Sequence, residues 1–370
     1  MAETIYLDYQ ATTPLAPEAL AAMEPWLRDG FANPHSSHAP GRAAAAAVAV
    51  AREQVADLLP AGGRLVFTSG ATEAINMALG AVKPLRAAGR DRVLVAPTEH
   101  AAVLDTAGAL ARDGFALQSL AVDAGGLVGP DTLSAGFDDR TALVAVMQVN
   151  NEIGVIQPVA AISEAAHGTG ALFLCDAVQG FGRIAAPENA DLIAISAHKI
   201  HGPKGIGALW IRDGVDVPPL IHGGGQEMGM RSGTLSPALC AGFGAAAQLA
   251  KNRMTADAAH VERLGTMARA LFAGWQVNGS TAHRYPGNLN IRREGLDVSR
   301  LMSDVRDVAF SSGSACASGS GRPSHVLKAL GLSSAAIKSS IRLGFGRYTT
   351  EVQLTRAAER INQAAEAQGL

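Results

Sequence analysis

The sequence has few cysteines, and its charges nearly balance. The three cysteines lie far apart, at Cys175, Cys240 and Cys316, which argues against a disulfide framework and against a zinc site. We therefore expect a reducing, cytoplasmic location and no bound metal. The formal net charge is −2 and the basic residues are scattered, so neither nucleic acid nor an anionic membrane is an expected partner.

Long apolar runs are also missing. The most apolar stretch, AAAAAVAVA between Arg42 and Arg52, is only about half as long as a membrane helix needs to be. The N-terminus, MAETIYLDYQ, has no basic start followed by an apolar stretch, so we do not expect a secretory signal. What the chain does have is 370 residues of which 48% are hydrophobic, and this favours a well-buried globular enzyme with more than one packed unit.

From about residue 64, short apolar segments alternate with helical ones. Strand-like segments include RVLVAP, TALVAVMQV, ALFLCDAV and DLIAISA. Because these segments are apolar nearly throughout, they predict an α/β fold with a mostly parallel sheet covered on both faces. After about residue 253 the pattern changes to one helix, short strands and a final amphipathic helix, which indicates a smaller α+β domain. We predict a large domain over 13–254 and a small domain formed by 1–12 and 255–370.

Three polar motifs follow predicted strands, where ligand sites of such sheets lie. FTSGATEAIN places Ser69–Thr72 before a helix, which suits a phosphate, although small residues there are also ordinary caps. Asp176 ends an apolar strand and would either pair with an arginine or hold a cationic ring nitrogen. Lys199 follows another strand and is a candidate for Schiff-base chemistry, with Lys204 as its competitor. Together the three motifs indicate a site for pyridoxal phosphate.

The chain resembles the cysteine desulfurases of the NifS/IscS type, which are fold-type I pyridoxal phosphate enzymes of the class-V aminotransferase family. The resemblance covers nearly the whole length. It rests on IYLDYQATTPL, FANPHSSH, FTSGATEAIN, TEHAAVLDT, VNNEIGVIQP, DAVQ, SAHKIHGPKGIGALW, HGGGQEMGMRSGTL, PGNLNI, SSGSACAS and SSIRLGFGRYTTE. It implies a large domain with a mostly parallel sheet and a smaller α+β domain.

The resemblance also implies a role for individual residues. Lys199 matches the Schiff-base lysine, and His100 matches the histidine stacked on the cofactor ring. Asn151 and Arg342 match the groups that hold the substrate carboxylate. The remaining cofactor contacts comprise phosphate ligands, ring contacts and a threonine that reaches the neighbouring subunit of a homodimer: Ala71, Thr72, Asp176, Gln179, Ser196, His198 and Thr234.

The implied reaction converts L-cysteine to L-alanine and leaves the sulfur on Cys316 as a persulfide, for delivery to a sulfur-acceptor protein in iron–sulfur cluster or thio-cofactor biosynthesis. Small residues flank Cys316 in AFSSGSACASGSG, and we expect this loop to be mobile, with the thiol away from Lys199 at rest. We expect Cys175 and Cys240 to be buried small hydrophobes.

Other functions stay open at this point. A selenocysteine lyase or another β-eliminating enzyme of the same fold is the nearest alternative, and a non-catalytic sulfur-relay scaffold is a distant one. A nucleotide-binding reading of the glycine-rich HGPKGIGA is disfavoured, because no ribose-binding acid follows it. The sequence does not identify the acceptor or the pathway.

Overall fold

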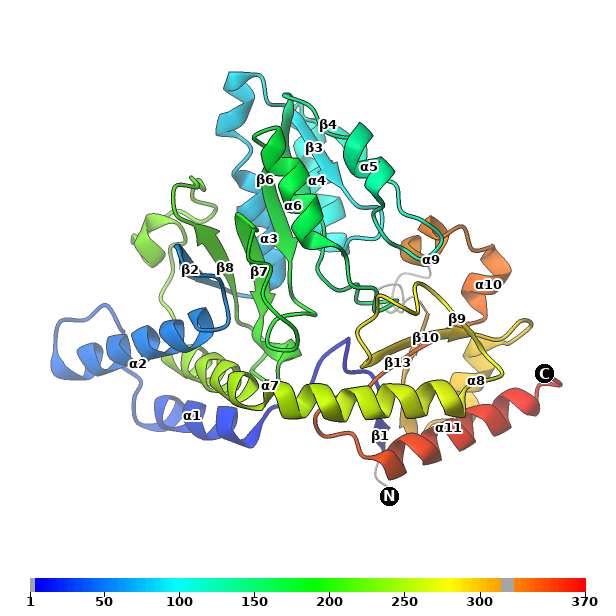
Figure 1. The fold of residues 1–370 in the computed structure, drawn as a ribbon. Coiled ribbons are helices and arrows are strands. Elements are labelled where there is room, and N and C mark those ends of the chain that lie inside the picture. Colours follow the sequence, from blue (N-terminus) through cyan, green and yellow to red (C-terminus); the bar gives the residue numbers. More distant parts are fainter. Residues whose placement is uncertain (1–3, 314–322) are drawn as a thin grey trace.

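A seven-stranded sheet forms the centre of the larger part of the molecule (Figure 1). The computed structural model describes residues 4–313 and 323–370. In spatial order the strands are β2 (Gly63–Thr68), β8 (Gly207–Arg212), β7 (Leu192–Ser196), β6 (Leu172–Asp176), β5 (Thr141–Ala145), β3 (Arg92–Val95) and β4 (Ala116–Ser119). The pairs from β7 to β4 are parallel, and β8 runs antiparallel to both of its neighbours, β2 and β7. This confirms the predicted α/β fold.

Helices cover both faces of this sheet, and each face has its own apolar core. One core contains side chains of α3 (Ala71–Gly80) and α4 (Ala101–Arg112). The other contains side chains of α1 (Pro17–Arg28), α2 (Ala39–Ala56), α6 (Val159–Gly168) and the first half of α7 (Pro237–Leu271). Strands buried on both faces explain why their sequences are apolar throughout rather than alternating. We call this part, with its short elements η1 (Pro84–Ala88), α5 (Pro130–Ala135), η2 (Ala197–Lys199) and η3 (Glu227–Gly229), the large unit.

A second, smaller unit is built on an antiparallel sheet with the order β12 (Ser311–Ser312), β13 (Ser340–Gly344), β10 (Asn288–Arg292) and β9 (Gln276–Val277). Its core also holds side chains of α8 (Val298–Asp304), α11 (Glu351–Glu366) and the parallel pair β1 (Ile5–Tyr6) and β11 (Val308–Ala309). The short helices α9 (His325–Ala329) and α10 (Ser334–Lys338) complete this unit.

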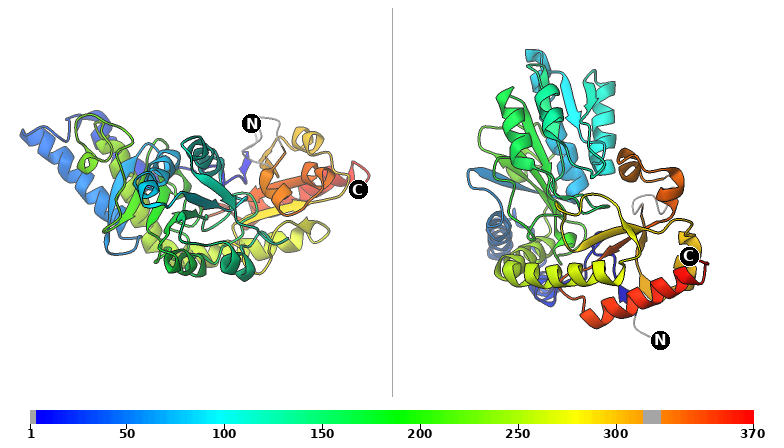
Figure 2. Two further views of the ribbon diagram at one scale, coloured as in Figure 1. Left: turned by 90° about the horizontal axis from the view of Figure 1, so that it is seen from above. Right: turned by 45° about the vertical axis from the view of Figure 1, so that its right-hand side comes forward.

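The helix α7 joins the two units, and Figure 1 shows it extending from α1 and α2 of the large unit to the strands and α11 of the small unit, an arrangement that Figure 2 shows from two further sides. Ser236 caps its N-terminus by accepting a hydrogen bond from the amide of Leu239 at 3.3 Å, and Pro237 occupies its first turn. The sequence predicted a helix that follows residue 253. In the structure this helix is the second half of α7, because Met254 lies in the middle of one continuous helix. The division into domains at this residue stays a prediction.

Cys175 and Cys240 are buried free thiols, as predicted. Cys316 lies outside the described residues, so the predicted mobility of its loop stays a prediction. Within the described part of the chain, no helix is long and apolar enough to cross a bilayer.

Candidate active site

A cavity of about 630 Å³ opens at the carboxyl ends of the parallel strands. Its wall contains most of the side chains that the sequence singled out, namely Ala71, Thr72, His100, Asn151, Asp176, Gln179, Ser196, His198, Lys199 and Arg342. Thr234 is exposed, lies on the connection between β8 and α7, and does not line this cavity. Lys204 lies at the cavity as well, but its side chain is exposed.

Lys199 ends the short helical turn η2, directly after strand β7. Its Nζ donates to the backbone carbonyl oxygens of Gln10 and, at 2.9 Å, Ala11. The same Gln10 carbonyl accepts a hydrogen bond from Nε2 of Gln179 at 2.9 Å. The N-terminal segment therefore crosses the cavity wall and fixes the lysine amine beside the amide of Gln179.

Asp176 is the last residue of strand β6, and its side chain is buried at the cavity wall. One carboxylate oxygen accepts the Val178 amide at 3.0 Å, and no ion pair to this carboxylate occurs among residues 4–313 and 323–370. Burial raises the pKa of Asp176, whereas the nearby His100 and Lys199 oppose that rise. A buried carboxylate that forms no close ion pair with a basic side chain favours a ligand that brings positive charge.

His100 is the N-cap of helix α4, and its Nδ1 accepts a hydrogen bond from the Ala102 amide at 3.1 Å. Burial, followed by the charge of Lys199 and the proximity of His325, lowers the pKa of His100 against the opposing effect of Asp176. The imidazole is thus neutral at neutral pH. Because Nδ1 is an acceptor, the ring carries its proton on Nε2.

The turn before helix α3 presents backbone amides at the cavity. The N-cap residue of α3 is Gly70, which has no side chain to accept a hydrogen bond. The first-turn amides of Ala71 and Thr72 therefore receive no side-chain cap from Gly70. Gly207 on the neighbouring strand β8 makes this close approach possible, since a Cβ there would lie 2.7 Å from the Gly70 carbonyl carbon. The first-turn acid Glu73 is neutralised by Arg231 at 2.7 Å.

Arg342 lies on strand β13 of the small unit, and 1% of its side chain is exposed. It donates to the carboxylate of Asp8 at 2.6 Å and to the Asn151 carbonyl at 3.0 Å. Its Nε has no acceptor within the described part of the chain. Arg342 is therefore oriented by protein contacts, lies at the cavity wall, and retains one buried donor, Nε, without an acceptor in the described part of the chain.

Sequence reasoning missed Asp8 and Gln10, which contact the site from the N-terminal segment. It also missed Glu99, which is fully buried behind the cavity and whose Oε1 accepts the Met147 amide at 2.8 Å. Burial, with Asp176 nearby, raises the pKa of Glu99 well above its usual range. The only available signal was that these residues belong to the motifs IYLDYQATTPL and TEHAAVLDT.

The fold and the cavity together define an enzyme of the aminotransferase type, with a lysine and an aspartate at the ends of neighbouring strands. The family described as "Aminotransferase class-V" matches residues 5–356. The cysteine desulfurase IscS of Rickettsia akari is 42% identical over 368 residues, which cover 96% of this chain and 90% of that protein.

Solved structures agree with this. A NifS-like protein is similar with a TM-score of 0.91 at 32% identity, covering 98% of this chain and 100% of that one. SspA in complex with cysteine is similar with a TM-score of 0.83 at 34% identity, covering 94% of this chain and 100% of that one. The chain belongs to the class-V aminotransferase family and, within it, to the cysteine desulfurases of the NifS/IscS type.

Proposed function

We propose that this chain binds pyridoxal phosphate in the cavity at Lys199 and uses it to transfer sulfur from L-cysteine to Cys316. The observation that carries the proposal is the buried Asp176 carboxylate, which faces the cavity and forms no ion pair within 4 Å in the described part of the chain, although the charge of Lys199 acts on it. A pyridinium nitrogen would neutralise it. The residues present therefore fit this cofactor, and the relatives support the same assignment.

In this proposal each wall of the cavity holds one part of the cofactor. Lys199 would supply the amine that binds the cofactor's aldehyde carbon, Asp176 would pair with the ring nitrogen, and Gln179 would contact the ring oxygen. The turn of Ala71 and Thr72, together with Ser196 and His198, would hold the phosphate. When bound, the cofactor supplies an electron sink that makes a Cα proton acidic and the Cβ–S bond labile.

The chain's own residues then bind the substrate and move its protons. Arg342 pairs with the α-carboxylate, since its planar fork matches that group and its Nε lacks an acceptor, and Asn151 assists it. The amine of Lys199 takes the Cα proton. His100 lies across the cavity wall as a neutral ring with its proton on Nε2, ready to donate it as charge develops.

Cys316 receives the sulfur. The substrate's Cβ–S bond breaks, an S–S bond to Cys316 forms, and a proton replaces sulfur on Cβ. One L-cysteine and one thiol thus give one L-alanine and one persulfide, without an external oxidant. The thiolate is the competent nucleophile. Cys316 lies outside the described residues, so this role rests on the motif SSGSACAS.

We further propose a cytoplasmic homodimer that passes the persulfide sulfur to an acceptor protein. Support for the dimer comes from Thr234, which is exposed and far in sequence from the cavity turns that it would complete in a neighbouring subunit. Large exposed apolar side chains lie on the same unit, including Leu27, Phe31 and Met228. The free thiols of Cys175 and Cys240 agree with a reducing compartment.

The test is formation of L-alanine and sulfide from L-cysteine with a thiol reductant present. The native protein is expected to be yellow and active, and Lys199→Ala to be inactive and without the visible band that borohydride bleaches in the native protein. Lys204→Ala is the matched control, because this lysine also lines the cavity but is exposed. A native protein that stays colourless after incubation with the cofactor would overturn the proposal.

A further inference from the structure

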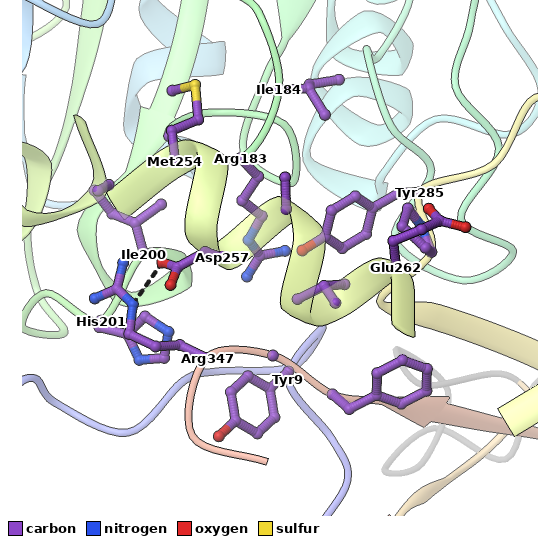
Figure 3. A pocket seen from close by; sticks show the side chains of 17 residues that line it. Tyr9, Arg183, Ile184, Ile200, His201, Met254, Asp257, Glu262, Tyr285 and Arg347 are labelled. Atoms are coloured by element: carbon purple, nitrogen blue, oxygen red, sulfur yellow. Dashed lines mark hydrogen bonds and ion pairs between the residues drawn. The ribbon is translucent and has the colours of Figure 1, made fainter. Parts of the chain in front are cut away.

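A second cavity, of about 210 Å³, lies where the large unit, the small unit and α7 meet (Figure 3). Its wall includes Arg183 and His201 from the large unit, Asp257 from α7, and Tyr285 and Arg347 from the small unit. None of these residues lines the site cavity. Two chain segments, residues 179–183 and 199–201, separate the two cavities. Gln179 and Lys199 line the site cavity, whereas Arg183 and His201 from the same two segments line the second cavity.

Arg183 contacts both of these segments. One guanidinium nitrogen, Nη2, donates to the backbone carbonyl of Lys199. The other, Nη1, donates to the side-chain oxygen of Gln179 at 3.1 Å and lies 3.4 Å from that residue's backbone oxygen. A single rigid fork therefore fixes the lysine backbone and the glutamine amide relative to one another.

The same guanidinium faces a ring of the small unit. The Arg183 Cζ lies 5.5 Å from the ring centroid of Tyr285, and Figure 3 shows the two side chains turned toward each other. Tyr285 is held in turn by its amide, which donates to the Gly154 carbonyl at 2.8 Å. Within residues 4–313 and 323–370 no carboxylate forms an ion pair with Arg183. Its charge is met by carbonyl oxygens and an aromatic face.

We propose that Arg183 is a positioning residue for the reaction: it fixes Lys199 and Gln179 from outside the site cavity and couples both to the small unit through Tyr285. This inference rests on the proposed function, because Lys199 and Gln179 are the assigned cofactor contacts. Reacting groups need placement to a fraction of an ångström, and support from behind a site is what provides it. The substrate-binding Arg342 contacts neither residue, so substrate binding is affected less than turnover.

The test compares Arg183→Lys and Tyr285→Leu with the native holoenzyme. Lysine keeps the charge but is unable to span the Lys199 carbonyl and the Gln179 amide together. We expect a kcat about tenfold lower, equivalent to about 1.36 kcal/mol, with the KM for L-cysteine within about twofold. The visible circular dichroism of the bound cofactor should also change, because it reports the orientation of the ring between Gln179 and Lys199. Tyr285→Leu should shift both readouts in the same direction by less.

Arg90→Lys is the matched control, since Arg90 also bridges two backbone carbonyls, those of Thr141 and Thr169 at 2.8 Å each, away from both cavities. This variant should lower the melting temperature without altering kcat or the dichroism. If Arg183→Lys behaves like Arg90→Lys in the loaded enzyme, Arg183 has a purely structural role and the inference fails. If the native protein itself neither binds the cofactor nor releases alanine, the proposed function fails instead, which separates the two results.

Discussion

Replacing Asp8 by alanine removes the charge partner of the most deeply buried guanidinium at the site. Arg342 has 1% of its side chain exposed and Asp8 has 19%, with 2.6 Å between them. Breaking a buried ion pair costs about 3–5 kcal/mol, and because Asn151 and Ser311 still accept from Arg342, we expect the lower end, about 3 kcal/mol. Asp8→Asn keeps an acceptor oxygen and should lose less than half of that.

This stability loss becomes a probe of substrate binding. If Arg342 receives the substrate carboxylate, then the product L-alanine neutralises the unpaired guanidinium in Asp8→Ala. The gain in unfolding free energy from saturating L-alanine should therefore be larger in Asp8→Ala than in the native holoenzyme, by about 1 kcal/mol or more. Urea unfolding at pH 7.5, with and without L-alanine and at a fixed cofactor concentration, measures both quantities.

The chain offers a closely matched control for this experiment. Arg347 and Asp257 lie 2.7 Å apart with 6% and 20% of their side chains exposed, and they line the second cavity rather than the site cavity. Asp257→Ala should lose a similar free energy of unfolding, but L-alanine should stabilise it no more than it stabilises the native enzyme. Equal stabilisation of native and Asp8→Ala proteins by L-alanine would refute the assignment of Arg342 to the carboxylate.

Three further predictions concern the pKa of His201, the buried acid Glu99 and the proposed subunit interface at Thr234. Burial, followed by the charge of Arg347, lowers the pKa of His201 from 6.5 to about 3. The contribution of the neutral His201 ring to the free energy of unfolding is therefore complete above pH 6.5 and is lost as the pH falls toward 3, with a loss of about 2 kcal/mol by pH 5. His201→Asn, which suits the left-handed backbone at this position, should remove this pH dependence from urea unfolding curves. Burial raises the pKa of Glu99 well above its usual range and so favours the uncharged acid. Glu99→Gln should therefore keep kcat within about twofold, whereas Glu99→Ala should lower the unfolding free energy by about 2 kcal/mol; a large loss of activity in the glutamine variant would require an ionised acid. Refolding a mixture of the Lys199→Ala and Thr234→Ala variants should restore activity. In a mixed dimer, one site combines the native Lys199 of one subunit with the native Thr234 of the other. Mixtures no more active than the separate variants would argue against a shared site.

The sequence predicted the large sheet because its strands are buried on both faces and so carry apolar runs that need no tertiary information. It did not predict α7 as one helix. The helix leaves the core of the large unit and enters that of the small unit, and most of the residues between 251 and 260 are exposed. That stretch resembles a connection because neither core covers it.

Some residues of the candidate site could likewise be predicted from local sequence patterns, and others could not. Asp176 and Lys199 follow apolar strands, so the rule that ligands bind at the carboxyl ends of parallel strands was sufficient to select them. Asp8 was out of reach, because its partner Arg342 is 334 residues away in the chain and no local pattern connects the two. Arg183 was missed for a related reason: it acts on the backbone of Lys199, and a contact to a backbone carbonyl leaves no trace in the residue types.

The central claim is that sulfur leaves L-cysteine by transfer to Cys316, and a single-turnover experiment tests it most directly. Holoenzyme is mixed with one equivalent of L-cysteine without reductant, and alanine release and protein-bound persulfide are measured together, in the native protein and in Cys316→Ala. We predict equal amounts of alanine and persulfide in the native protein, persulfide at Cys316 by mass spectrometry, and neither product in Cys316→Ala. The variant Cys240→Ala, which lacks a buried thiol, should behave as the native protein does. Alanine release by Cys316→Ala at the native rate would contradict the account.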